Sequence, residues 1–111
     1  MTVAELKALG ADTEDGVKRC AGNEAFYLKL VPKALEEGKY TELANQIGEK
    51  NFEAAFETAH ALKGVLANLS ITPLYEVICE ITELLRNRQD VDYSAILEKM
   101  KAVRKGFADL L

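Results

Sequence analysis

The only histidine of the chain, His60, is followed by Lys63 three positions later and by Gly64 four positions later. A neutral imidazole is a competent nucleophile near pH 7. On a helix, a lysine three residues further along lies within reach of any group that the ring carries. An imidazole beside a cation suits a transient anion, such as a phosphoryl group, bound to the ring. Because there is a single histidine, chemistry that needs two imidazoles is excluded within one protomer.

Residues 52–69 must position these side chains, because apolar residues recur there at helical spacing after Asn51, a residue type that caps helices. When Phe52 is set at zero and each residue advances the helix by about 100°, one arc collects the apolar side chains and predicts the core face. That arc holds Phe52, Ala55, Phe56, Ala59, Leu62, Leu66 and Leu69. Lys63 falls at its edge, at about 20°, whereas His60 at about 80° and Gly64 at about 120° fall outside it. We therefore expect the imidazole to face solvent.

Gly64 needs a reason, because a glycine inside a helix costs roughly 1 kcal/mol relative to alanine. It lies one turn after His60 on the same face, and Ala61 adds only a methyl group beside it. These two small residues predict open access to the ring for a large partner.

The N-terminal half outside this helix is also predicted to be helical, since alternating β-branched runs and hairpin turn signals are missing. A first helix begins with the capping box Thr2 and Glu5 and ends at Gly10, and a second covers about residues 13–20. A third extends from Asn23 to Gly38, with Pro32 expected to kink or split it near Val31. A fourth covers residues 41 to about 50.

After residue 69, Thr72 is the predicted N-cap of a further helix and Pro73 its first helical residue. This helix places an apolar stripe from Leu74 to Leu85 opposite Glu76, Glu80 and Glu83. Asp90 or Asp92 is expected to cap a last helix, whose apolar side runs from Ile96 to Leu110. Short connections make sequential helices antiparallel neighbours. The sequence therefore predicts an all-α fold, an antiparallel up-down four-helix bundle with additional short N-terminal helices.

Composition excludes several classes of protein. A chain of 111 residues, of which 49% are apolar, predicts one globular domain over residues 1–111. A net charge of −4 makes nucleic acid and anionic membranes poor partners, and no apolar stretch approaches a membrane span. Because the first residues carry Glu5 and no apolar run, no secretory signal is expected there. Cys20 and Cys79 are far apart in sequence, and although one disulfide between them is possible, reduced thiols and a cytoplasmic location are favoured. Because the apolar positions fit one core, a monomer is expected.

The run Ala59-His60-Ala61-Leu62-Lys63-Gly64, followed by Ala67-Asn68-Leu69, resembles the signature of histidine-containing phosphotransfer (Hpt) domains. These domains carry His-x-Leu-Lys-Gly on a helix of a four-helix bundle. Residues 16–20 and 23–28 are similar to the N-terminal helices of the family, and residues 72–74 to the start of its next helix, so that the resemblance extends over about residues 12–105. The chain departs from the pattern at Ser70, where the family often has glycine, and at Pro32, where it usually keeps an apolar helical residue.

The resemblance implies a phosphorelay intermediate. His60 would accept a phosphoryl group through Nε2 from the aspartyl phosphate of one receiver domain and pass it to the aspartate of another. Lys63 would favour the phosphorylated state and Gly64 would keep the approach clear. Expected contacts with the partner are Glu57, Ala61, Ala67 and Asn68. No cofactor is expected on this chain, because the receiver would supply Mg²⁺, and without a nucleotide-binding signature no kinase activity from ATP is expected.

The same residues allow other interpretations. The main alternative is a helical interaction module, such as an adaptor, that has lost phosphotransfer. His60 and Lys63 can also be ordinary surface residues, and Glu53 and Glu57 a solubilising face. A zinc site would lack partners, because a lone histidine with these two carboxylates cannot complete a closed site. Tyr75, Cys79 and Arg86 share a side of their helix and are interpreted as packing or surface residues.

Overall fold

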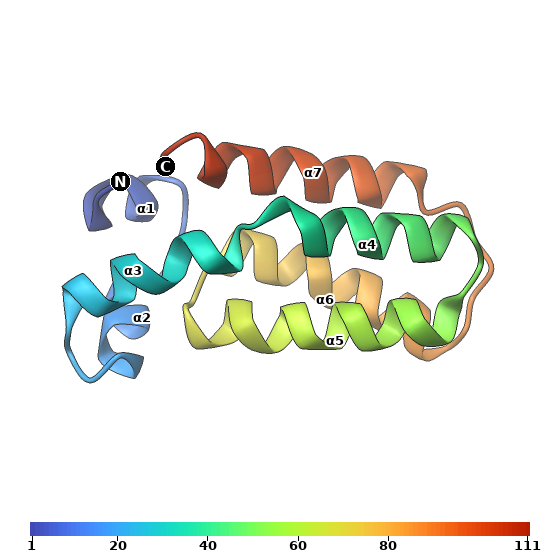
Figure 1. Ribbon diagram of the computed structural model, residues 1–111, viewed down its shortest axis with the longest axis horizontal. Coiled ribbons are helices and arrows are strands. Elements are labelled where there is room, and N and C mark those ends of the chain that lie inside the picture. The colour runs from blue at the N-terminus through green and yellow to red at the C-terminus, as the bar shows by residue number, and fades with distance from the viewer.

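The computed structural model describes residues 1–111, and all its regular elements are helices (Figure 1). Their bounds are α1 Val3–Ala8, α2 Thr13–Arg19, α3 Glu24–Ala34, α4 Glu37–Gly48, α5 Phe52–Asn68, α6 Thr72–Arg86 and α7 Ser94–Ala108. The chain is therefore all-α, as predicted. No helix is long and apolar enough to traverse a lipid bilayer, and Cys20 and Cys79 are not joined by a disulfide.

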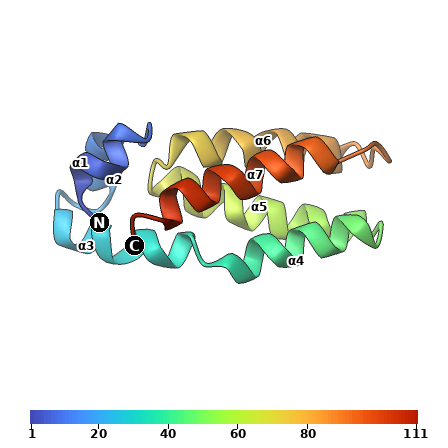
Figure 2. The same ribbon diagram turned by 90° about the horizontal axis from the view of Figure 1, so that it is seen from above.

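Helices α4, α5, α6 and α7 form an antiparallel bundle along the longest axis of the molecule, which measures 41 Å (Figures 1 and 2). Helix α5 packs against α4 and α6, and α6 packs against α7. The short helices α1, α2 and α3 gather at the end of the bundle where α5 turns into α6. The four-helix bundle with additional N-terminal helices is thus confirmed.

One continuous apolar cluster joins the bundle to the N-terminal helices. The stripe predicted for α6 belongs to this cluster, because Leu74, Val77, Ile78, Ile81 and Leu85 are all buried, while Leu84 is half-buried. The predicted core face is confirmed for Ala55, Ala59, Leu62 and Leu66 on α5 and for its C-cap Leu69. Phe52, the first residue of the helix, and Phe56, at the edge of the arc, are half-buried. The buried face of α5 fixes which residues the opposite face presents to solvent.

The caps predicted for the N-terminal helices and for α5 are confirmed. The Thr2 side chain accepts a hydrogen bond from the Glu5 amide at 3.1 Å, and the Glu5 carboxylate accepts one from the Thr2 amide at 2.8 Å. Asn23 caps α3 and Asn51 caps α5 through their side-chain oxygens. These bonds satisfy amides that have no partner within the helix.

The predicted break around Pro32 was wrong in position. Helix α3 continues through Pro32 to Ala34, and the chain separates α3 from α4 only at Leu35 and Glu36. A proline removes its own amide donor, and here it lies in the last turn, where the following residues still form a turn closed by the bond from the Leu35 amide to the Pro32 carbonyl. Helix α4 accordingly begins at Glu37 rather than Thr41, and Gly38 belongs to its first turn instead of ending the preceding helix.

Two predicted caps in the C-terminal half need correction. Ile71, not Thr72, occupies the N-cap of α6, and Thr72 and Pro73 lie within the first turn, where a missing amide donor costs no hydrogen bond. The N-cap of α7 is Tyr93 rather than an aspartate. The Asp92 carboxylate nevertheless accepts a hydrogen bond from the Ser94 amide at 2.9 Å, while Asp90 pairs with Lys50.

Candidate functional site around His60

His60 lies on the exposed face of α5, one turn before the exposed Gly64. Its neighbours in sequence divide as the helical projection predicts, because Ala59 and Leu62 are buried and Ala61 is exposed. The backbone beneath the imidazole is therefore held by core packing, while the ring faces solvent. This combination presents a nucleophile from a rigid support.

The space above Gly64 is open. A Cβ atom added there would meet no heavy atom within 4 Å. The glycine is thus not required for packing inside the protein, and its cost to the helix of roughly 1 kcal/mol has no structural return. The glycine is explained instead by the open surface that it leaves beside the imidazole.

Lys63 is half-buried, at the edge of the core face, as predicted. It belongs to none of the ion pairs in the structure. Its apolar stem can pack along α5 while the ammonium reaches solvent. A cation that no carboxylate of the chain neutralises is therefore available one turn from His60.

An aromatic ring and two guanidinium groups lie on one side of His60, and the sequence did not reveal this arrangement. The Phe56 and His60 rings are stacked, with centroids 5.9 Å apart and planes inclined by 20°. The guanidinium carbons of Arg86 and Arg88 lie 5.3 Å and 5.4 Å from the centroid of the Phe56 ring. The sequence predicts a core position for Phe56 and a packing or surface position for Arg86, and it gives no signal for Arg88. The signal in the sequence is the position of Phe56 at about 40° in the projection, which is the edge of the apolar arc.

The residues expected to contact a partner do not share a single environment. Glu57, Ala61 and Asn68 are exposed on α5, on the same side as His60 and Gly64. Ala67 is half-buried and borders a polar recess with Asp15, Ser70 and Tyr75 among its walls. The structure thus brings three of the four residues to the open face and places the fourth at its border.

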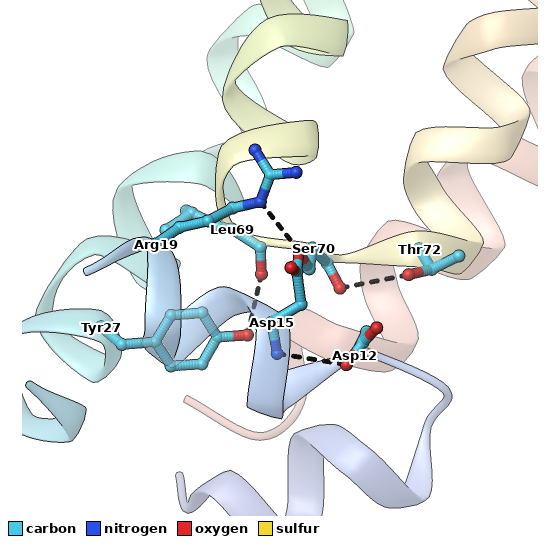
Figure 3. A network of polar contacts seen from close by, with 7 residues as sticks. All are labelled: Asp12, Asp15, Arg19, Tyr27, Leu69, Ser70 and Thr72. Carbon is cyan, nitrogen blue, oxygen red and sulfur yellow. Dashed lines mark hydrogen bonds and ion pairs between the residues drawn. The ribbon is translucent and has the colours of Figure 1, made fainter. Parts of the chain in front are cut away.

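The C-terminal end of α5 is fixed by polar contacts with α2 and α3 (Figure 3). The Tyr27 hydroxyl donates a hydrogen bond to the Leu69 carbonyl at 2.9 Å, and burial raises the pKa of this phenol to about 12. The Ser70 hydroxyl donates to the Asp15 carboxylate at 2.5 Å, which also accepts from Arg19 at 2.8 Å. The hydrogen bond from Ser70 contributes most, followed by that from Arg19, and together they hold the pKa of Asp15 below its usual value.

The same contacts explain one departure from the family pattern. Ser70 has a φ of 53°, in the left-handed region that favours glycine. Serine accepts this conformation here with its hydroxyl bonded to Asp15. Gly16 meets a different requirement, since a Cβ there would lie 2.5 Å from Tyr27 Cε1 and 2.7 Å from the Leu69 carbonyl oxygen. Helix α2 can therefore approach the end of α5 only with glycine at this position.

No three His, Cys, Asp or Glu side chains lie close enough together to hold a metal ion. The arrangement offers an exposed nucleophile, an unneutralised ammonium and a cationic aromatic edge.

Among known protein families, the one described as Hpt domain matches residues 35–110. The match covers α4 to α7, including the helix that carries His60, and it confirms the resemblance in the motif. It begins after α3, so that the similarity expected for residues 16–28 lies outside the matched range. Comparison with curated proteins and with solved structures finds no significant match to either.

Proposed function

Because this chain belongs to the Hpt domain family, whose members are phosphocarrier modules of two-component signalling rather than kinases, we propose that it accepts a phosphoryl group on His60 from the aspartyl phosphate of a receiver domain and passes it to the aspartate of another. In this proposal the chain is a carrier, and the partners supply both donor and acceptor carboxylates. Lys63 and Gly64 serve the same step from the turn that follows His60.

The observation that carries the proposal is the exposed imidazole on a well-packed helix, with open space at Gly64. Transfer between two proteins requires the reacting atoms to approach to about 3–3.5 Å, so that neither surface can hold a bulky group between them. A side chain fixed on the regular helix α5 has few conformations to lose when a partner docks. An adaptor without phosphotransfer would have no use for the helix-destabilising Gly64 beside a bare imidazole.

The chemical step exchanges one bond to phosphorus for another. The lone pair of the neutral His60 Nε2 attacks the phosphorus of the acyl phosphate, and the bond from phosphorus to the aspartyl oxygen breaks. Its electron pair leaves with the carboxylate, while the proton on Nδ1 stays in place. Reversal of the same step, with a second aspartate as the attacking group, returns the imidazole to its starting state.

The phosphoryl oxygens on His60 would carry about two negative charges, by analogy with other protein phosphoryl groups near pH 7, and the ring that keeps its Nδ1 proton would carry one positive charge. Lys63 can offset part of the negative charge, by an amount that is modest for exposed charges, about 0.2–1 kcal/mol. The Mg²⁺ that stabilises charge during phosphoryl transfer would be bound by the receiver.

The test is a two-step transfer with purified components. A receiver domain carrying radiolabelled aspartyl phosphate and Mg²⁺ is mixed with this protein, and an unlabelled second receiver is added later. The label is expected to move to this chain as an acid-labile, base-stable phosphate and then to the second receiver, whereas ATP alone should label nothing. Binding of receivers without any labelling of the chain would favour the adaptor alternative and contradict the proposal.

A further inference from the structure

The cationic edge beside His60 consists of Phe56, Arg86 and Arg88, which we call the Arg–Phe–Arg cluster. Phe56 comes from α5, Arg86 ends α6, and Arg88 follows in the turn after it. The two arginines are more than 25 positions away from Phe56 in sequence, yet both guanidinium groups meet its ring. Because the same ring is stacked with the His60 imidazole, the two cations lie one aromatic ring away from the proposed phosphoacceptor.

Most of the charge of this cluster is available to a partner. Both arginines are exposed. Arg86 forms an exposed ion pair with Glu83 at 3.2 Å, while Arg88 forms no ion pair and donates a hydrogen bond to the Leu85 carbonyl at 2.7 Å. Lys63 lies on the same side of α5. Of these three cations, only Arg86 is paired with a carboxylate, that of Glu83.

The stack also restrains the arginines. A guanidinium over an aromatic ring gains about 0.5–1 kcal/mol at an exposed site, and the backbone bond made by Arg88 fixes it further. Side chains held near their bound positions lose less entropy when a partner docks. The cluster is therefore better prepared to bind an anion than solvated lysines would be.

The charge of the surface changes sign from one side of His60 to the other. Glu53 and Glu57 are exposed on the outer face of α5, at about 100° and 140° in the projection, whereas Phe56 and Lys63 lie at about 40° and 20°. His60 thus stands between an acidic outer face and a cationic edge toward α6. A partner with a concentration of carboxylates beside its reacting group would dock with those carboxylates toward α6.

Receiver domains have that chemistry under the proposed function. Their reacting group is a carboxylate or its phosphate, and a bound Mg²⁺ requires further carboxylate ligands close by. We infer that the Arg–Phe–Arg cluster is a docking site for the acidic rim around the receiver's phosphorylated aspartate, and that it orients the receiver on α5 and speeds its association. This inference rests on the proposed function for the identity of the partner.

The experiment measures binding rather than phosphoryl transfer, so that the two proposals can fail separately. Receiver domains of the source organism, loaded with Mg²⁺ and beryllofluoride, are titrated against the protein, and the tightest binder is kept. Its dissociation constant is compared at 50 mM and 500 mM NaCl for the wild type and for Arg86→Gln/Arg88→Gln. Lys99→Gln/Lys101→Gln on α7 is the matched control, because it removes the same net charge and one of its lysines has a similar exposed pair with a glutamate.

Rim charges act mainly on association and lose their effect in salt. We expect the arginine variant to bind about fivefold more weakly than the wild type at 50 mM NaCl and within about twofold at 500 mM. The control should remain within twofold at both. Arg86→Lys/Arg88→Lys preserves the charge but loses the planar stacking on Phe56, so its affinity at 50 mM NaCl should lie between those of the glutamine variant and the wild type. If the glutamine variant fails to fold, the lysine variant carries the test, and wild-type affinity in it would overturn the inference.

Equal weakening in the control variant would assign the effect to net charge and overturn the inference, as would a loss that persists unchanged at 500 mM NaCl or no binding by any receiver. Normal labelling of His60 together with arginine-independent binding would leave the proposed function standing without the docking site. Arginine-dependent, salt-sensitive binding without labelling of His60 would support the docking site and contradict the proposed function.

Discussion

Replacement of Gly64 by leucine separates stability from function in this protein. Gly64 lies in the interior of α5, and a Cβ at this position would meet no heavy atom within 4 Å. Leucine forms helix better than glycine by somewhat less than 1 kcal/mol, so that Gly64→Leu should raise the free energy of unfolding by about 0.8 kcal/mol. For a domain of this length, the melting temperature should rise by about 3 °C.

The same side chain should obstruct transfer. In a helix, a leucine side chain points back over the preceding turn, which here carries His60 and Ala61. It would occupy the approach that a receiver aspartate needs, and a displacement of about 1 Å can cost about a hundredfold in rate. We therefore expect phosphoryl acceptance to slow by at least tenfold, equivalent to about 1.4 kcal/mol in the barrier.

The assay pairs thermal unfolding with the rate of labelling by a phosphorylated receiver. Gly106→Leu on α7 is the matched control, because this helical glycine also has open space around its Cβ position and belongs to a different helix from the imidazole. It should gain stability without losing transfer. If Gly64→Leu unfolds the bundle, the glycine serves close packing, and if it transfers at the normal rate, the access argument is refuted.

Three further perturbations test other parts of the account. Gly16→Ala should destabilise the fold by about 1–3 kcal/mol in chemical denaturation, because its Cβ would lie 2.5 Å from the Tyr27 ring; an unchanged midpoint would show that α2 can shift freely. Lys63→Ala should shorten the lifetime of phosphohistidine at low salt, with the difference shrinking in about 0.5 M NaCl; equal lifetimes would make Lys63 a solubilising residue. Asp15→Asn should lower the melting temperature at pH 7, since a depressed carboxyl pKa stabilises the fold above the ordinary value of 3.8. That difference should disappear as the pH falls from 3.8 through the lowered folded pKa of Asp15, and a constant difference at all pH values would contradict the ionic role.

The exposed histidine and its open neighbour could be predicted because they depend on one helix alone. A rotation of about 100° per residue and a clear apolar face are sufficient to place His60 and Gly64 on the outside of α5. The same local rules identified the caps at Thr2, Asn23 and Asn51. Family resemblance then supplied the chemistry that spacing alone suggests only in outline.

Contacts between helices were beyond these local rules. The Arg–Phe–Arg cluster requires the packing of α5 on α6, together with the turn that carries Arg88 back toward Phe56. Likewise, the serine at the end of α5 tolerates a left-handed conformation in a network with Asp15, 55 positions earlier. The sequence predicts the end of α3 too early, near Val31, because a proline in the last turn does not stop a helix at once. The helix continues through Pro32 to Ala34.

The central claim is that His60 carries the phosphoryl group, and site mapping after transfer from a phosphorylated receiver tests it most directly. Peptide mass spectrometry at alkaline pH should find one phosphate on His60 in the wild type. His60→Gln should carry none while retaining the wild-type melting temperature, because replacement of an exposed side chain seldom costs more than about 0.5 kcal/mol. Phosphate on another residue, or undiminished labelling of a folded His60→Gln protein, would contradict the account.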